Sequence, residues 1–180
     1  DLGFSPPSNS YLSEAELYQP EKYYPLRILF CRNCWLVQTE DYASAEEIFN
    51  ENYAYFSSVS KSWLKHAHDY VEMITKRLKL TKESFVVEIA SNDGYLLKNF
   101  VSKRIDCLGI EPTKSTAVEA IKLGIKVEEI FFTAQSALRL SNKRKADLII
   151  GNNVFAHVPD VTGFTTGLNT LLSDEGTITL

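Results

Sequence analysis

The stretch FVVEIASNDGYLLKNF, Phe85 to Phe100, is the part of the sequence that decides the fold. An apolar run leads into a short polar turn, and the turn leads into the start of a helix. This order is typical of a parallel α/β sheet, where each buried strand is followed by a crossover helix. Turns that hold a dinucleotide at this junction are rich in glycine, but this one contains only Gly94. The turn is therefore either a cofactor site of another kind or an ordinary connection.

The alternation of strand and helix continues to the end of the sequence. Apolar runs predict strands at 85–90, 106–110, 126–129, 147–151 and 176–180. Helical patterns predict helices at 94–103, 114–123, 134–140 and 163–172. We therefore expect an α/β fold of the Rossmann-like, doubly wound type, with strand order 3-2-1-4-5.

The residues before 81 have a different pattern. The runs Leu26–Phe30 and Trp35–Thr39 predict two short strands that flank CRNC, which holds Cys31 and Cys34. Ser44 is followed three residues later by a glutamate, which predicts a capping box and a short helix.

A longer helix is expected over 61–80, because apolar residues recur there at helical spacing. The stripe consists of Leu64, Ala67, Val71, Ile74 and Leu78. We divide the chain into an N-terminal module (1–60), a connecting helix (61–80) and a Rossmann-like domain (81–180).

Composition excludes some classes of function. The 180 residues are 44% apolar and 23% charged, as in ordinary globular proteins, and the net charge of −4 argues against a nucleic-acid partner. No run is long enough to span a membrane, and no secretory signal is visible, so we expect a cytoplasmic protein with reduced thiols. The sequence starts without Met and ends inside a predicted strand. We therefore expect a piece of a longer protein, with the last strands of the sheet truncated.

The residues that follow the strands should form the site, because ligands of such sheets bind beyond the carboxyl ends of the strands. After the first strand come Ala90, Ser91, Asn92, Asp93 and Gly94. Small residues let the backbone approach a ligand, but without G-x-G-x-x-G we do not expect NAD or FAD. Glu88 and Asp93 add negative charge, which suits a cation, or hydroxyl and amino groups, better than phosphate.

Glu111 ends the second strand, about twenty residues past the first turn, where an acidic side chain can accept hydrogen bonds from ribose hydroxyls. It also precedes a helix, so it could simply interact with the helix dipole. After the third strand, Phe131 and Phe132 could lie in the core, or one of them could stack on an adenine.

After the fourth strand, Asn152 and Asn153 offer amide groups at the point where the strand order reverses, and His157 follows on the same side. A histidine there is a candidate acid, base or stabiliser of an enolate. Together these residues predict a nucleoside cofactor without phosphates, bound beside a cationic centre. S-adenosylmethionine has those properties.

The sequence also resembles a known family, the C-methyltransferases that act on nucleotide-linked 4-keto-deoxysugars. The resemblance rests on segments that occur in the family's order along nearly the whole chain. They are LGFSPPSNSYL, YPLRILFCRNCWLVQ, NYAYFSS, VVEIASNDGYLL, LGIEPTK, FF and GNNVFAHVPD.

The resemblance implies roles for particular residues. The turn from Glu88 to Tyr95 would hold the methionine end of S-adenosylmethionine, and the Glu111–Pro112 step the ribose. Phe132 and Asn153, with the neighbouring Asn152, would face the adenine. Tyr53 and His157 would line the sugar pocket and handle protons, although Tyr53 and Tyr55 could instead be packing aromatics. The activity implied is methylation of a carbon made nucleophilic when a base generates an enolate.

The family also carries a zinc module near its N-terminus, built from two C-x-x-C pairs. Cys31 and Cys34 would be half of such a site, with the other pair upstream of Asp1. Two other readings stay open. One is an S-adenosylmethionine-dependent O- or N-methyltransferase acting on another small molecule, and the other is a cofactor-binding or interaction module without turnover.

Overall fold

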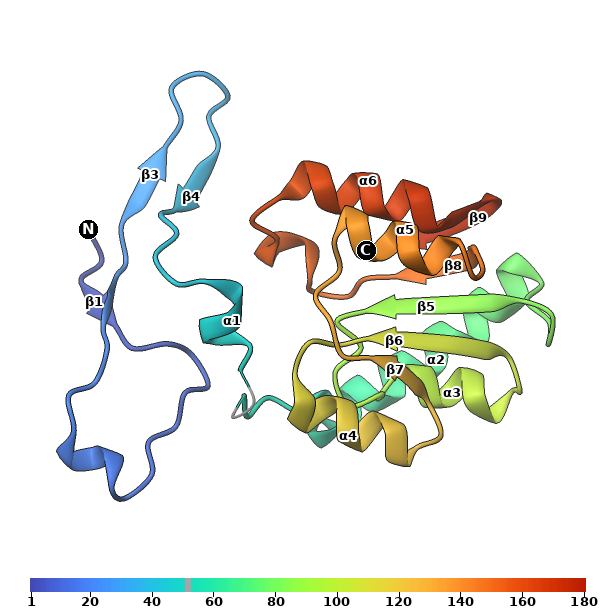
Figure 1. The fold of residues 1–180 in the computed structure, drawn as a ribbon, viewed down its shortest axis with the longest axis horizontal. Coiled ribbons are helices and arrows are strands. Elements are labelled where there is room, and N and C mark those ends of the chain that lie inside the picture. The colour runs from blue at the N-terminus through green and yellow to red at the C-terminus, as the bar shows by residue number, and fades with distance from the viewer. Residues whose placement is uncertain (51–52) are drawn as a thin grey trace. The chain divides into compact units, whose positions relative to one another are not determined.

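A computed structural model describes residues 1–50 and 53–180 of the chain (Figure 1). Asn52, the first residue of the NYAYFSS segment, lies outside the described residues. Contacts divide the chain into two compact units, Asp1–Tyr55 and Phe56–Leu180, and each is described by itself.

The second unit is built on a parallel sheet in the order β7-β6-β5-β8-β9. The central strand β5, Phe85–Ile89, has all its residues buried, because helices cover both faces of a parallel sheet. The other strands are β6 (Asp106–Ile110), β7 (Lys126–Glu128), β8 (Ala146–Ile150) and β9 (Leu172–Thr179). This is the predicted 3-2-1-4-5 order, so the predicted fold class is confirmed.

Helices cover the sheet on both faces (Figure 1). One apolar cluster lies under α2 (Lys61–Leu78), α3 (Leu97–Ser102) and α4 (Lys114–Lys122). A second lies under α5 (Ala134–Ser141) and α6 (Val161–Leu171). Two hydrophobic layers around one sheet make a rigid support for the loops at the ends of the strands. Among the described residues, no helix has the length and apolar character needed to cross a membrane.

Helix α2 packs on the sheet through the predicted apolar stripe. Ala67, Val71 and Ile74 are buried, and the two leucines at the ends of the stripe pack against the same cluster. Ser60 caps the helix by accepting a hydrogen bond from the backbone N–H of Trp63, at 3.3 Å. This hydrogen bond fixes the start of α2 at Lys61.

The first unit consists of short elements. They are β1 (Phe4–Ser5), η1 (Glu16–Tyr18), β2 (Tyr24–Pro25), β3 (Ile28–Phe30), β4 (Val37–Thr39) and α1 (Ala45–Ile48). Strands β3 and β4 lie within the two segments expected to be strands on either side of CRNC, and they pair antiparallel. Helix α1 begins with the predicted capping box between Ser44 and Glu47. None of the described residues of this unit is buried, so it has no apolar core of its own.

Both the backbone conformation and the space around position 94, in the turn after β5, favour glycine there. Its φ is +76°, and a Cβ there would lie 2.3 Å from Ile125 Cδ1. Gly124 has a similar φ of +80°, but a Cβ there would meet only a methyl group of Val101, at 4.0 Å. Gly94→Ala should therefore destabilise the protein more than Gly124→Ala, by about 1 to 3 kcal/mol of overpacking.

Urea unfolding of the two variants measures this difference. The backbone strain of alanine at positive φ, roughly 1 to 2 kcal/mol, is common to both variants and cancels. Equal losses of unfolding free energy would mean that the contact between Gly94 and Ile125 does not constrain the turn.

Candidate cofactor site

The turn after β5 has an unusual backbone. Ala90, Asn92 and Gly94 all have positive φ, at 57°, 50° and 76°. Backbone hydrogen bonds hold this shape, from Ala90 N–H to the Ile110 carbonyl at 2.8 Å and from Gly94 N–H to the Ser91 carbonyl at 3.1 Å. Residues other than glycine rarely take this conformation, and where they do it often marks a functional site. Ala90 and Asn92 thus adopt the same positive-φ conformation as Gly94, the single glycine of the turn.

Buried polar atoms around this turn lack partners. Glu88 and Ser91 have no exposed surface, and Asp93 is 3% exposed. Among the described residues, both carboxylate oxygens of Glu88, Ser91 Oγ and Asp93 Oδ1 have no hydrogen-bond partner. A buried polar group without a partner is costly, so native proteins seldom leave several of them together. Their arrangement at the carboxyl end of β5 fits a polar ligand that supplies the missing hydrogen bonds.

Burial raises the pKa of Glu88 well above its ordinary value, and the nearby carboxylates of Glu111 and Asp93 raise it further. The Tyr95 hydroxyl lowers this pKa, with an effect smaller than that of burial but larger than that of either carboxylate. The protein therefore favours the neutral form of this carboxyl group while the site holds no positive charge. A cationic ligand would favour the ionised form.

Glu111 follows β6 and is 4% exposed. Its Oε2 accepts a hydrogen bond from Asn92 N–H at 2.9 Å, and its Oε1 accepts one from Thr113 N–H at 2.9 Å. It thus joins the first turn to the start of α4, where Pro112 is half-buried. The helix-end role considered from the sequence is visible, and the ribose role stays a prediction, because each carboxylate oxygen can accept a second bond.

The loop after β8 meets the first turn. Asn152 Nδ2 donates to the Tyr95 hydroxyl at 3.2 Å, and the neighbouring Asn153 has a positive φ of 53°. His157 is exposed and ends the short helix η3, Phe155–His157. The structure therefore brings Asn152 together with Tyr95, whereas His157 lies further along the loop at the surface.

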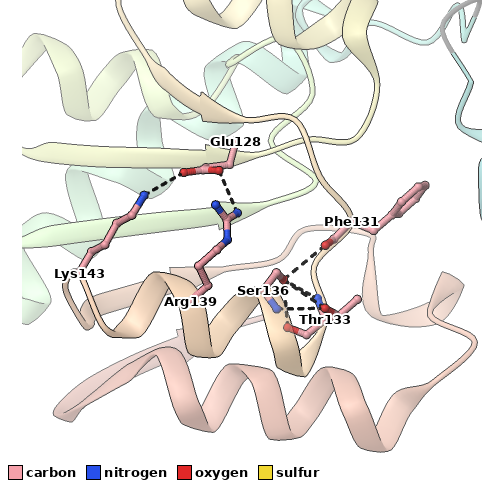
Figure 2. Close-up of polar contacts among 6 residues, drawn as sticks. All are labelled: Glu128, Phe131, Thr133, Ser136, Arg139 and Lys143. Atoms are coloured by element: carbon pink, nitrogen blue, oxygen red, sulfur yellow. Dashed lines mark hydrogen bonds and ion pairs between the residues drawn. The ribbon is translucent and has the colours of Figure 1, made fainter.

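The loop after β7 is held by helix α5. Thr133 and Ser136 form a capping box, and Ser136 Oγ also donates to the Phe131 carbonyl at 3.4 Å (Figure 2). The ring of Phe131 points away from this cap (Figure 2). Phe132 packs edge-on against Phe164, with ring centroids 5.2 Å apart. Phe132 is thus partly a core residue, and its contact with adenine stays a prediction.

Glu128 anchors the other end of the same helix. It pairs with Arg139 at 3.0 Å and with Lys143 at 3.4 Å (Figure 2). These contacts tie β7 to α5 and so support the loop between them.

Sequence reasoning missed the residues that precede and begin α2. Ser57 N–H donates to Asn92 Oδ1 at 2.9 Å, and Ser58 N–H donates to Asp93 Oδ2 at 3.1 Å. Trp63 stacks on Tyr95 with ring centroids 5.9 Å apart. No sequence pattern identifies the two serines, because they contribute backbone groups and lie 35 residues from their partners.

The remaining predicted residues lie in the first unit. Tyr53 is half-buried, and its ring packs edge-on against Phe49, with centroids 5.3 Å apart. Cys31 and Cys34 are free thiols at the end of the β3–β4 hairpin. Hydrogen bonds from the backbone N–H groups of Cys34 and Asn33 lower the pKa of the Cys31 thiol, which favours the thiolate that binds metal.

Two thiolates do not complete a tetrahedral zinc site, which needs four ligands. Among the described residues, no group of three or more His, Cys, Asp or Glu side chains could hold a metal ion. The residues present fit one half of a structural zinc site.

Comparison with known proteins bears on both units. Residues 1–49 match a protein family described as "Putative zinc binding domain". The chain is similar to the C-methyltransferase NovU of Streptomyces niveus, with 28% identity over 176 residues, 97% of this chain and 42% of NovU. The chain therefore spans less than half the length of this curated relative. The resemblance to C-methyltransferases stated from the sequence is confirmed.

Solved structures bear on the second unit. An S-adenosylmethionine-dependent methyltransferase of Clostridium acetobutylicum matches with a TM-score of 0.52 at 16% identity, covering 64% of this chain and 48% of that one. The fold is that of S-adenosylmethionine-dependent methyltransferases. DesVI of Streptomyces venezuelae matches with a TM-score of 0.53 at 14% identity, covering 67% of this chain and 51% of DesVI. At these identities the likeness concerns the methyltransferase fold, with its ligand side at the carboxyl ends of the strands.

Glu88→Gln should remove a pH dependence of stability. The pKa of Glu88 is raised in the folded state, so unfolding releases a proton at pH values above the unfolded-state pKa of about 4.3. The free energy of unfolding therefore falls as the pH rises, by up to about 1.4 kcal/mol per pH unit. This loss continues until the pH passes the folded-state pKa. The variant lacks this group, so its stability relative to the wild type should increase over the same range.

Urea unfolding of both proteins at several pH values from 5 to 8 measures the effect. Glu83→Gln is a control, because Glu83 is exposed and its folded-state pKa is lowered. Parallel stability curves for the wild type and Glu88→Gln would show that Glu88 is not a buried neutral acid.

Proposed function

We propose that this chain carries the cofactor-binding part of an S-adenosylmethionine-dependent C-methyltransferase acting on a nucleotide-linked 4-keto-deoxysugar. One observation carries the proposal: at the carboxyl end of the central strand of a methyltransferase-type sheet, both oxygens of Glu88 and Oδ1 of Asp93 are buried without a hydrogen-bond partner among the described residues. Carboxylates complement the amino group and the sulfonium of this cofactor, whereas they repel the pyrophosphate of a dinucleotide. The resemblance to NovU, a C-methyltransferase, supports the reaction type.

The residues proposed to hold the cofactor come from four strand ends. Glu88 and the turn Ala90–Tyr95 face its methionine end, with Ser91 Oγ and Asp93 Oδ1 available as acceptors. Glu111 and Pro112 serve the ribose, and Phe132 borders the adenine. Asn152 and Asn153 close the site from the loop after β8. When bound, the cofactor supplies an electrophilic methyl group.

The chain's own residues would prepare the carbon that accepts this methyl group. A base takes the proton from the carbon beside the ketone, the C–H electrons form a C=C bond, and the ketone oxygen becomes an enolate oxygen. We assign this proton handling to His157 and Tyr53, which have imidazole and phenol groups suited to it. His157 lies on the loop after β8, and Tyr53 precedes Ser57 of the cofactor-binding unit by four residues. A positioned donor beside the enolate oxygen would stabilise its charge.

An O- or N-methyltransferase acting on another small molecule would share the cofactor half of this site but would not need a carbon-acid base. A module that binds S-adenosylmethionine without turnover would also keep the cofactor half. The two readings are separated from the proposal by turnover with a keto-sugar nucleotide and by the consequence of replacing His157.

His157→Asn in the complete protein should lower turnover of a 4-keto-deoxysugar nucleotide by about 10²- to 10⁴-fold, the usual contribution of a general acid or base. The thermal shift given by S-adenosylhomocysteine should stay as in the wild type, because His157 is not among the cofactor contacts. Such a ligand stabilises the protein by about 2.7 kcal/mol at 100 times its Kd, whereas NAD should give no shift.

His68→Asn is the matched control, since His68 is an exposed histidine on α2. Near-normal turnover of His157→Asn would remove His157 from the mechanism. No thermal shift with S-adenosylhomocysteine, or a shift with NAD instead, would contradict the cofactor assignment.

We also propose that Cys31 and Cys34 supply two of the four ligands of a structural zinc ion. The family matched by residues 1–49 and the lowered pKa of the Cys31 thiol support this proposal. The first unit has no buried residue among those described, so it would gain stability from such an ion, because metal binding contributes directly to the folding of small domains.

Zinc content of the complete protein, measured by mass spectrometry of the metal, tests this site. Cys31→Ser should lose the metal and lower the melting temperature. Cys107→Ala should retain it, because Cys107 is buried in the second unit with a thiol pKa of about 12. A wild-type protein without zinc, or unchanged zinc in Cys31→Ser, would contradict the assignment.

A further inference from the structure

A short strap, Phe56–Ser60, joins the first unit to helix α2 and is fastened to the cofactor turn. It consists of η2, Ser57–Val59, and one residue on either side. Two consecutive backbone N–H groups, those of Ser57 and Ser58, donate to the side chains of Asn92 and Asp93. The strap is thus held by the turn that the proposed cofactor occupies.

Neither bond is an incidental surface contact. Ser57 is only 8% exposed, so its N–H would be buried without a partner if the Asn92 side chain were absent. Asn92 has a φ of 50°, a conformation that asparagine and glycine tolerate better than other residues. Its backbone N–H already donates to Glu111 Oε2. The side chain and the backbone of Asn92 thus connect the strap to the carboxylate of Glu111.

Asp93 makes the second connection and retains one free atom. Its Oδ2 accepts from Ser58 N–H, whereas its buried Oδ1 has no partner among the described residues. A ligand that binds Oδ1 would therefore act on a carboxylate that already holds the strap.

We infer that Asn92 and Asp93 are positioning residues that couple the strap to the occupancy of the cofactor turn. This inference rests on the proposed function. The side chain of Asn92 accepts a hydrogen bond from the strap, and the backbone of Asn92 is part of the cofactor turn. A ligand that orders the turn also orders the strap, and by thermodynamic reciprocity a fastened strap strengthens ligand binding by the same factor.

The coupling has a consequence for the proposed chemistry. Tyr53 precedes Ser57 by four residues, so these two hydrogen bonds mark where the chain that carries this tyrosine joins the cofactor-binding unit. If cofactor binding orders the strap, the chain next to Tyr53 is ordered before the sugar substrate binds. The cofactor would then bind first and the sugar second.

Hydrogen exchange of the complete protein, with and without S-adenosylhomocysteine, tests the coupling. In the wild type, the ligand should slow exchange of the Ser57 and Ser58 amides. Asn92→Gly keeps the backbone conformation but removes the acceptor, and this slowing should disappear at Ser57 while the ligand still binds. Asn92→Asp retains an acceptor oxygen and should restore the slowing.

A second variant approaches the same bond from the strap. Ser57→Pro removes the donor without changing the turn, and Phe56 before it is already extended, with φ −112° and ψ 117°, as a residue before proline should be. Ser57→Pro and Asn92→Gly should each weaken S-adenosylhomocysteine binding by about fivefold, as for the loss of one hydrogen bond. The double variant should be no weaker than either single variant, since both remove the same interaction.

The outcomes are distinguishable. Ligand binding with unchanged exchange at Ser57 and Ser58, or additive losses in the double variant, would overturn the coupling and leave the proposed function standing. Absence of any binding of S-adenosylhomocysteine by the wild type would overturn both.

Discussion

A carboxyl group with no exposed surface lies on the central strand of the sheet, and the site is organised around it. Glu88 pairs through its backbone with both neighbouring strands, and its side chain lies on the same face of the sheet as Val86, which belongs to the apolar cluster under α2. Among the described residues its oxygens have no hydrogen-bond partner, and burial, together with two nearby carboxylates, raises its pKa. An interior seldom tolerates such a group without a function, and this supports the cationic ligand proposed for the turn beside it.

The order of the strands explains why residues distant in sequence meet at this carboxylate. Strand β5 lies between β6 and β8, so the loops after these three strands share one edge of the sheet. Glu111, from the loop after β6, and Asn152, from the loop after β8, both form hydrogen bonds with residues of the turn after β5. Each contact therefore joins a neighbouring loop to the first turn.

Much of this architecture was predictable, and particular residues show why. The stripe on α2 and the capping box at Ser44 are local patterns, and both appear as expected. The close approach of Gly94 to Ile125 was not expected, because packing partners are not encoded in spacing. Phe132 was expected to be a core residue or an adenine contact, and the structure shows its packing against Phe164.

The sequence by itself determined the alternation of strands and helices, the order of the sheet and the strand ends at which polar residues gather. Periodicity and the handedness of crossover connections are sufficient for that. Only the tertiary structure decided which polar atoms are paired. The strap uses the backbone N–H groups of Ser57 and Ser58, which every residue except proline has, so no side-chain pattern could reveal their bonds to Asn92 and Asp93. Likewise, the exclusion of Glu88 from solvent depends on burial by segments far away in the chain, and burial is a property of the folded molecule alone.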